Sequence, residues 1–143
     1  MRTILHLSNV ATGSDTVFDA LTSTQGLAGW WTTEVSGDAG AGGVINFTFD
    51  GKVFNPDMKV VEIEASSIVA WKCVGGVEQW ADNSFRFELE DSNGTTKTRF
   101  RQDYATELSD DDYAIYNYNW GYYLESLRLY CETGKGKPFP AAV

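Results

Sequence analysis

The side chains that could carry out chemistry in this sequence are few, and they do not form a catalytic set. His6 is the only histidine, and it stands in a predicted first strand without a recognisable partner for nucleophilic catalysis. Cys73 and Cys131 do not have the spacing of a metal site. The sequence therefore predicts no metal, no cofactor and no catalytic nucleophile. Acid–base chemistry by a buried Glu62 or Glu64 stays open.

Gln102 is the one strongly polar side chain on a predicted strand face that is otherwise aromatic. A buried amide without partners costs about 1–3 kcal/mol, so Gln102 either bonds Tyr and Trp tips inside the core or lines a wet cavity. Tyr104, Tyr116, Trp120 and Tyr123 could donate hydrogen bonds to the same space. So many large rings with polar tips are hard to pack without a void, which favours a cavity on the order of a few hundred Å3.

These side chains need elements that position them, and the first is a long C-terminal helix. It is predicted to begin near Ser109, where Ser109 and Asp112 resemble a capping box, and to end at Thr133-Gly134. Gly121 inside it suggests close approach of another backbone, because glycine there costs up to about 1 kcal/mol relative to alanine. One stripe of this helix is aromatic and leucine-rich, with Tyr116, Trp120, Tyr123, Leu127 and Tyr130 at helical spacing.

Between residues 43 and 105 the sequence reads as a series of antiparallel strands. The clearest pair is 85–90 with 97–104, which are joined by the tight-turn signal Asp91-Ser92-Asn93-Gly94. One face of this pair carries opposite charges and the other is apolar, as an antiparallel sheet covered on a single side requires. The residues that we expect on the covered face are Phe85, Phe87, Leu89, Phe100 and Tyr104.

The N-terminal part predicts a strand over residues 2–9 and then two short helices. The first is capped by Ser14 or Asp15, and the second is capped by Thr22 or Ser23 and ends near Trp30-Trp31. The glycine-rich segment 37–43 lacks the ending of a phosphate-binding loop and has no helix after it, so we expect a hairpin connection there.

Length and composition limit the classes of function. A chain of 143 residues with 43% hydrophobic and 14% aromatic residues fits one domain, 1–143. Its formal net charge of −9 disfavours nucleic acid and anionic membrane surfaces. No apolar stretch approaches the roughly 20 residues of a membrane span, and no signal-peptide pattern is visible. We therefore expect a cytoplasmic protein without membrane insertion, and free, buried cysteine thiols.

Three segments resemble a known family. Residues 17–22 followed by 26–32, with Trp30-Trp31, are similar to its opening helices. Residues 43–47 are similar to its glycine pair and strand, and residues 120–127 to its Gly-Trp and leucine helix. The family is named after the C-terminal domain of the activator of heat-shock-protein ATPase. It belongs to the START-related (SRPBCC) superfamily of polyketide cyclases and birch-pollen-allergen-like proteins.

The resemblance implies an α+β helix-grip fold, in which a curved antiparallel sheet of about six or seven strands wraps a long C-terminal helix. Two short helices follow the first strand. Where members often carry a histidine, this chain has Gln102, which argues against proton transfer. The residues that we expect around a pocket between helix and sheet are Trp30, Trp31, Phe47, Phe49, Trp71, Phe85, Phe87, Phe100, Gln102, Tyr104, Tyr116, Trp120 and Tyr123.

Members of the superfamily bind lipids, sterols, hormones or polyketides, and a few catalyse cyclisation. The resemblance therefore implies a protein that binds a small apolar or aromatic molecule, as a monomer or homodimer. Two alternatives stay open. The first is a co-chaperone-like module that interacts with a chaperone, with a stress-response role, and the second is a cyclase or hydrolase that acts on a hydrophobic substrate. We predict a binding protein rather than an enzyme.

Overall fold

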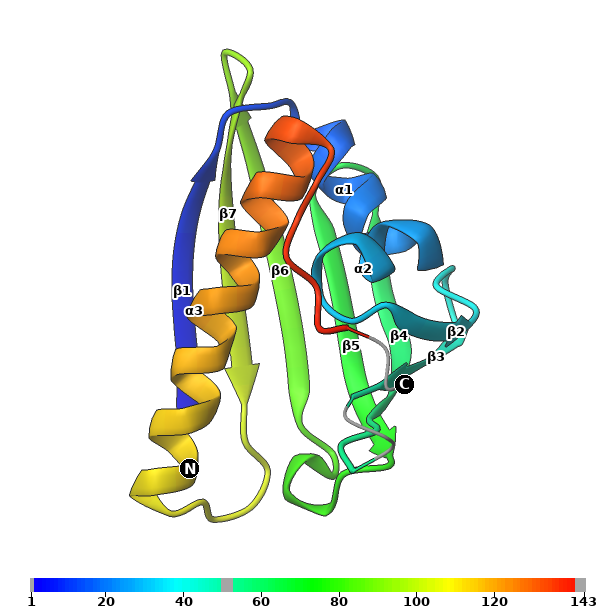
Figure 1. Ribbon diagram of the computed structural model, residues 1–143, viewed down its shortest axis with the longest axis vertical. Helices are drawn as coiled ribbons and strands as arrows, with labels where there is room; N and C mark the ends of the chain where they lie inside the picture. The colour runs from blue at the N-terminus through cyan, green and yellow to red at the C-terminus, as the bar shows by residue number, and fades with distance from the viewer. Residues whose placement is uncertain (1, 50–52, 141–143) are drawn as a thin grey trace.

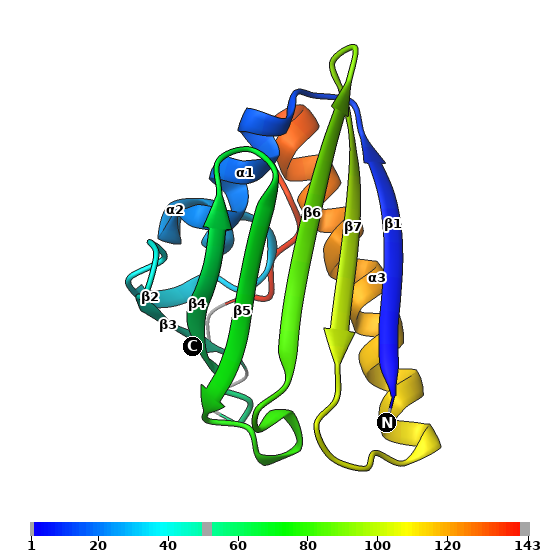
Figure 2. The same cartoon turned by 180° about the vertical axis from the view of Figure 1, so that it is seen from behind.

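One antiparallel sheet of seven strands forms one layer of the molecule, and the helices lie on a single side of it (Figures 1 and 2). The computed structural model describes residues 2–49 and 53–140. The strand order is β1-β7-β6-β5-β4-β3-β2, and every neighbouring pair is antiparallel. The strands are β1 (Thr3–Val10), β2 (Glu34–Gly37), β3 (Val44–Thr48), β4 (Asp57–Glu64), β5 (Ile68–Gly75), β6 (Ser84–Ser92) and β7 (Thr95–Asp103).

The described residues also form three α-helices and a short 3-10 helix. They are α1 (Ser14–Thr22), α2 (Thr24–Trp30), η2 (Glu78–Trp80) and α3 (Asp110–Thr133). Helix α3 runs along the sheet in front of β1 and β7, whereas α1 and α2 cover the part nearer β4 and β5 (Figure 1). The predicted α+β helix-grip fold, with two short helices after the first strand, is confirmed.

The hairpin of β6 and β7 forms as predicted. On its outer side Glu88 lies opposite Arg99 and Glu90 opposite Lys97, whereas Arg86 lies opposite Arg101, so two of the three charged pairs combine opposite charges. The turn uses Asn93 and Gly94, whose φ angles of 53° and 82° are the left-handed values that a two-residue hairpin turn requires. The local turn chemistry and the alternation therefore agree, and both could be read from the sequence.

The covered side of the sheet and the helices share one aromatic core. The inward positions of β5, β6 and β7 contribute Trp71, Phe85, Phe87 and Phe100, each at most 1% exposed. Helix α3 contributes Trp120, Leu124 and Leu127. Its start is the predicted one, because the Ser109 side chain accepts a hydrogen bond of 3.1 Å from the Asp112 amide, and Gly134 ends it with φ 82°.

Several local expectations were wrong. Neither Ser14 nor Asp15 caps α1. Its N-cap is Gly13, and the Ser14 amide instead donates a 3.0 Å hydrogen bond to Asp91 at the far end of β6. Strand β2 was not predicted, because four residues are too few to show alternation. The segment 37–43 is a hairpin connection from β2 to β3, as expected.

Gly121 does not meet another backbone. A Cβ at this position would lie 3.5 Å from the His6 ring, which is ordinary contact. Both cysteines are free, as predicted, but only Cys73 is buried, whereas Cys131 is partly exposed. Within residues 2–49 and 53–140, none of the helices has the length and apolar character that crossing a membrane demands.

Candidate functional site

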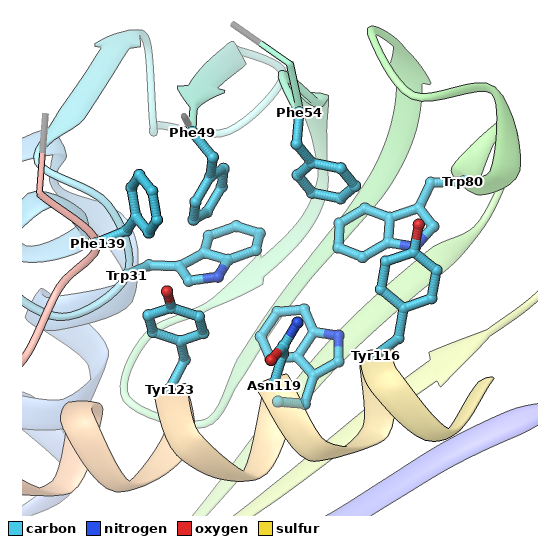
Figure 3. Close-up of a pocket in the computed structure, with 9 residues that line it drawn as sticks. Trp31, Phe49, Phe54, Trp80, Tyr116, Asn119, Tyr123 and Phe139 are labelled. Carbon is cyan, nitrogen blue, oxygen red and sulfur yellow. The ribbon is translucent and has the colours of Figure 1, made fainter. Parts of the chain in front are cut away.

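A cavity of about 200 Å3 lies between α3 and the end of the sheet near η2 (Figure 3). Its lining is uncharged and almost entirely aromatic. The lining residues are Trp31, Phe49, Phe54, Trp80, Tyr116, Asn119, Trp120, Tyr123 and Phe139. Most of these rings also contact one another, and these contacts hold the walls rigid. The cavity is therefore the space that the packed rings leave between them.

Trp31 is the central ring of this site. It is the C-cap residue of α2, and its indole packs 5.0 Å from Trp120 and 4.4 Å from Phe47 between ring centroids. Its neighbour Trp30 turns into the core and donates a 2.9 Å hydrogen bond to the Ala20 carbonyl. The two consecutive tryptophans therefore have different environments, one beside the cavity and one behind it.

One side of α3 forms a wall of the cavity. Tyr116, Asn119, Trp120 and Tyr123 follow the i, i+3, i+4, i+7 pattern, so they lie on one face of the helix. The Tyr116 hydroxyl donates a 2.5 Å hydrogen bond to the Gln79 side chain. This contact fixes the Tyr116 ring at the edge of the cavity.

The remaining walls come from chain segments without regular structure. Phe49 and Phe54 form an isolated bridge, with a backbone hydrogen bond of 2.8 Å and an edge-to-face contact at 5.6 Å. Phe139 arrives from the C-terminal tail, where its amide donates to the Trp31 carbonyl at 2.8 Å. A surface groove of about 300 Å3 continues from the cavity and shares Asn119, Tyr123 and Phe139 with it.

Gln102 lies beneath the cavity and is completely buried. Its Oε1 accepts a 2.8 Å hydrogen bond from Trp120 Nε1, so the amide bonds an aromatic tip, as the first of the two alternatives supposed. Gln102 Nε2, Trp80 Nε1 and the Tyr104 hydroxyl are buried without a hydrogen-bond partner. These three polar atoms therefore lack hydrogen-bond partners among the described residues.

Burial also sets the protonation of the tyrosines. It raises the pKa of Tyr104, Tyr116 and Tyr123 above the ordinary tyrosine value. The N–H groups of Trp80 and Gln102 act against this rise at Tyr104 but do not overcome it. All three hydroxyls are therefore protonated and neutral at neutral pH, and they offer hydrogen bonds rather than charge.

The arrangement offers little for acid–base or metal chemistry. Glu62 forms an ion pair of 2.8 Å with Arg86 and is partly exposed, and Glu64 is exposed, so neither is the buried acid that the sequence left open. His6 Nε2 lies 3.1 Å from Asn117 Oδ1. No three His, Cys, Asp or Glu side chains of residues 2–49 and 53–140 converge as metal ligands would.

The structure brings together five of the thirteen predicted pocket residues as cavity walls: Trp31, Phe49, Tyr116, Trp120 and Tyr123. It buries the other eight in the core behind them: Trp30, Phe47, Trp71, Phe85, Phe87, Phe100, Gln102 and Tyr104. The alternation of apolar and polar residues identifies which side chains point inward. It does not distinguish the side chains that line a cavity from those that pack behind them. Contact of any of these residues with a ligand stays a prediction.

Four lining residues were missed: Phe54, Trp80, Asn119 and Phe139. Phe54 and Phe139 lie outside the strands and helices. Trp80 lies in η2, which at three residues is too short for a periodic pattern to reveal. Asn119 could have been found, because it lies three residues after Tyr116 on the same helical face.

Comparisons with known proteins agree with this fold. The chain is similar to the Aha1 dimer from Colwellia psychrerythraea, with 34% identity, a TM-score of 0.84, and coverage of 95% of this chain and 100% of that chain. SSP2350 from Staphylococcus saprophyticus has 18% identity and a TM-score of 0.74, with 95% and 96% covered. CalU16 from Micromonospora echinospora has 18% identity and a TM-score of 0.75, with 95% and 77% covered. No curated protein matches the sequence significantly.

The family comparison covers most of the chain. The model of the family described as "Activator of Hsp90 ATPase homolog 1-like protein" matches residues 11–132, which run from the turn before α1 to the last turn of α3. On this match and the 34% identity over the whole Aha1 structure, the chain belongs to the Activator of Hsp90 ATPase homolog 1-like family.

Proposed function

We propose that this protein binds a small, uncharged, hydrophobic or aromatic molecule in the cavity between α3 and the sheet. The observation that carries the proposal is a void of about 200 Å3 walled by rings and free of charged side chains. A dry apolar cavity of about 150 Å3 is already large enough to bind benzene. One substituted ring therefore fits inside, and a longer substituent would follow the groove that shares Asn119 and Phe139 with the cavity.

Ethylbenzene is a suitable first probe, because it is neutral, apolar and of the right size. Titration followed in 1H–15N correlation spectra is expected to shift the indole N–H signals of Trp31, Trp80 and Trp120 to saturation. Asn119→Trp places a large ring at the cavity wall and should abolish these shifts. Ile115→Trp is the matched control, because Ile115 is an exposed residue of α3 outside the cavity.

Absence of saturable shifts in the unmodified protein would contradict the proposal, and so would equal binding by Asn119→Trp. Native mass spectrometry of the purified protein, before and after denaturation, gives an independent test. A molecule that leaves only on denaturation would support the proposal and identify the natural ligand. A pull-down that enriches one chaperone from a preparation without bound ligand would instead favour the co-chaperone alternative.

We further infer homodimer formation through the outer face of β1, as a second candidate role. Leu5 and Leu7 are 65% and 60% exposed on this face and lie opposite Arg101 and Arg99. Large aliphatic side chains exposed together are typical of an interaction surface. The Colwellia protein with 34% identity is described as a dimer, which supports a second copy as the occupant.

Light scattering coupled to size exclusion tests this inference. The unmodified chain is expected to elute as a dimer, and Leu5→Ser with Leu7→Ser as a monomer. Val61→Ser is the control, because Val61 is 54% exposed on β4, away from the β1 edge. A monomeric unmodified protein, or a dimer that survives the double substitution, would refute the assignment.

A further inference from the structure

Strand β1 lies at one end of the sheet order, and one of its two edges has no partner strand. Among the described residues it pairs with β7 alone, and Figure 2 shows it at the margin of the sheet. Its inward side chains His6 and Ser8 are partly exposed. Their neighbours on β7, Phe100 and Thr98, are at most 1% exposed. The second edge of β1 is therefore open along the middle of the strand.

The hydrogen-bond pattern shows which backbone groups of β1 point to this open side. The Tyr104 amide donates to the Arg2 carbonyl at 2.9 Å, and hydrogen-bonded positions alternate along an antiparallel pair. The even-numbered residues of β1 therefore bond β7, and the backbone N–H and C=O groups of Leu5, Leu7 and Asn9 point away from it. Within residues 2–49 and 53–140 these groups have no hydrogen-bond partner. We call them the free edge.

Helix α3 holds β1 near both ends and leaves the free edge unpaired. The Tyr113 hydroxyl donates a 3.0 Å hydrogen bond to the Thr3 carbonyl at the start of the strand. Just past its end, the Ala11 amide donates a 2.8 Å hydrogen bond to Glu132. The strand is thereby fixed in extended form before any partner arrives, which lowers the entropy cost of binding there.

The free edge also lacks the features that keep edge strands apart. Exposed edges in monomeric proteins are short, or they carry charges, prolines or bulges. Strand β1 has eight residues, no acidic or basic side chain apart from His6, no proline and an uninterrupted register with β7. The edge strand at the other end of the sheet, β2, has four residues and carries Glu34. Only β1 is therefore suited to pair with a further strand.

Resting on the proposed homodimer, we propose that β1 pairs through its free edge, antiparallel, with β1 of a second copy, so that one sheet runs through both. The pairing is centred on His6, and Leu5 lies opposite Leu7 of the partner subunit. This register gives every exposed leucine of β1 an apolar cross-strand neighbour on the outer side of the sheet. A second copy fits because its own β1 has the same length and leucine spacing, and it brings no acidic side chain to a chain of net charge −9.

A disulfide across the twofold axis tests this register. His6 would face His6 of the partner subunit at a non-hydrogen-bonded position, where Cα atoms are about 4.5 Å apart and a disulfide can form. His6→Cys is made together with Cys131→Ser, which removes the partly exposed native thiol. Mild oxidation is expected to convert most of the monomer band on a non-reducing gel to a dimer band. Ser8→Cys in the same background is the matched control. Ser8 is also inward and partly exposed but would face Ile4 of the partner subunit, so this variant should stay monomeric on the gel.

Amide hydrogen exchange of the unmodified dimer gives a second test that needs no substitution. With the proposed pairing, the Leu5 and Leu7 amides should exchange as slowly as those of Ile4 and His6, which bond β7. A dimer formed by side chains alone leaves the Leu5 and Leu7 amides facing water. They should then exchange roughly tenfold or more faster than their neighbours.

A dimeric protein with fast exchange at Leu5 and Leu7 and no His6→Cys crosslink would overturn the inference and leave the homodimer to another surface. Crosslinking of Ser8→Cys as complete as that of His6→Cys would overturn the register. Slow exchange caused by a different, co-purified polypeptide would assign the free edge to a foreign strand and overturn the inference too. A monomer by light scattering would instead contradict the proposed homodimer itself.

Discussion

A single hydrogen bond, from Trp120 Nε1 to Gln102 Oε1 at 2.8 Å, connects the long helix to the sheet inside the aromatic core. Both residues are almost completely buried, so water cannot replace either partner. Gln102→Leu keeps a similar volume but leaves the indole N–H unpaired. We expect a loss of about 1–3 kcal/mol in the free energy of unfolding, measured by urea denaturation.

Tyr104→Phe is the matched comparison, at the buried position two residues later and just past the end of β7. Its hydroxyl has no hydrogen-bond partner, so its removal deletes a buried polar group rather than a contact. The expected change lies within about 0.5 kcal/mol of zero or is stabilising. Equal losses in the two variants would show that the Trp120 contact has no special role.

For single residues, the sequence predicted which way a side chain points better than which side chain it contacts. The alternation along β7 and into the residue after it correctly placed Phe100, Gln102 and Tyr104 inward, but the choice between a bonded and a solvated Gln102 depended on Trp120. That partner comes from a different element, and its distance is set by tertiary packing. No local pattern contains this information.

Two glycines in helices provide a test at the level of elements. A Cβ at Gly26 would lie 2.7 Å from Ala20 Cα, so Gly26 allows α2 to pack closely on α1. At Gly121 a Cβ would find ordinary contact at 3.5 Å from His6. Gly26→Ala should therefore cost about 1–3 kcal/mol through overpacking. Gly121→Ala should stabilise the protein by about 0.5–1 kcal/mol through helix propensity.

Thermal and urea unfolding of both alanine variants measure these effects. Opposite signs are the informative result, since the same substitution is made in both helices. A stabilising Gly26→Ala would contradict the close packing of α1 and α2, and a strongly destabilising Gly121→Ala would restore the close backbone approach that the sequence suggested.

Helices and strands with a clear period of apolar residues could be predicted from the sequence, and segments without such a period could not. The β6–β7 hairpin and α3 combine periodicity with a turn or cap signal, and both form where expected. For the tail that carries Phe139, the sequence predicted only that α3 ends before it, at Thr133-Gly134. The tail is held by backbone hydrogen bonds with Trp31 and Thr33, more than a hundred residues earlier in the chain. The part of the cavity wall that Phe139 forms therefore depends on contacts that are not local.

The whole molecule should lose stability at alkaline pH in a characteristic way. Burial raises the pKa of Tyr104, Tyr116 and Tyr123 in the folded protein above the ordinary value of about 10. Above that value the unfolded chain loses these protons while the folded protein keeps them. Stability from this source is complete below about pH 9 and falls as the pH rises through 10 and beyond.

Urea denaturation at pH 8, 10 and 11 measures this fall. Tyr104→Phe removes the most strongly affected group and should give a shallower decrease than the unmodified protein. Tyr118→Phe is the control, because Tyr118 is 72% exposed on α3, and its curve should follow that of the unmodified protein. Identical slopes in all three proteins would contradict the assignment to the buried hydroxyls.

The anchoring of the C-terminal tail beside Trp31 has a practical consequence for experiments. Phe139 lines the cavity and Pro140 lines the groove, so a sequence appended to this tail is tethered within a few residues of the binding site. A purification tag fused there would be present at an effective concentration in the millimolar range and would compete with added compounds. Compound screening should therefore use a tag placed before β1, because no residue of β1 lines the cavity or the groove.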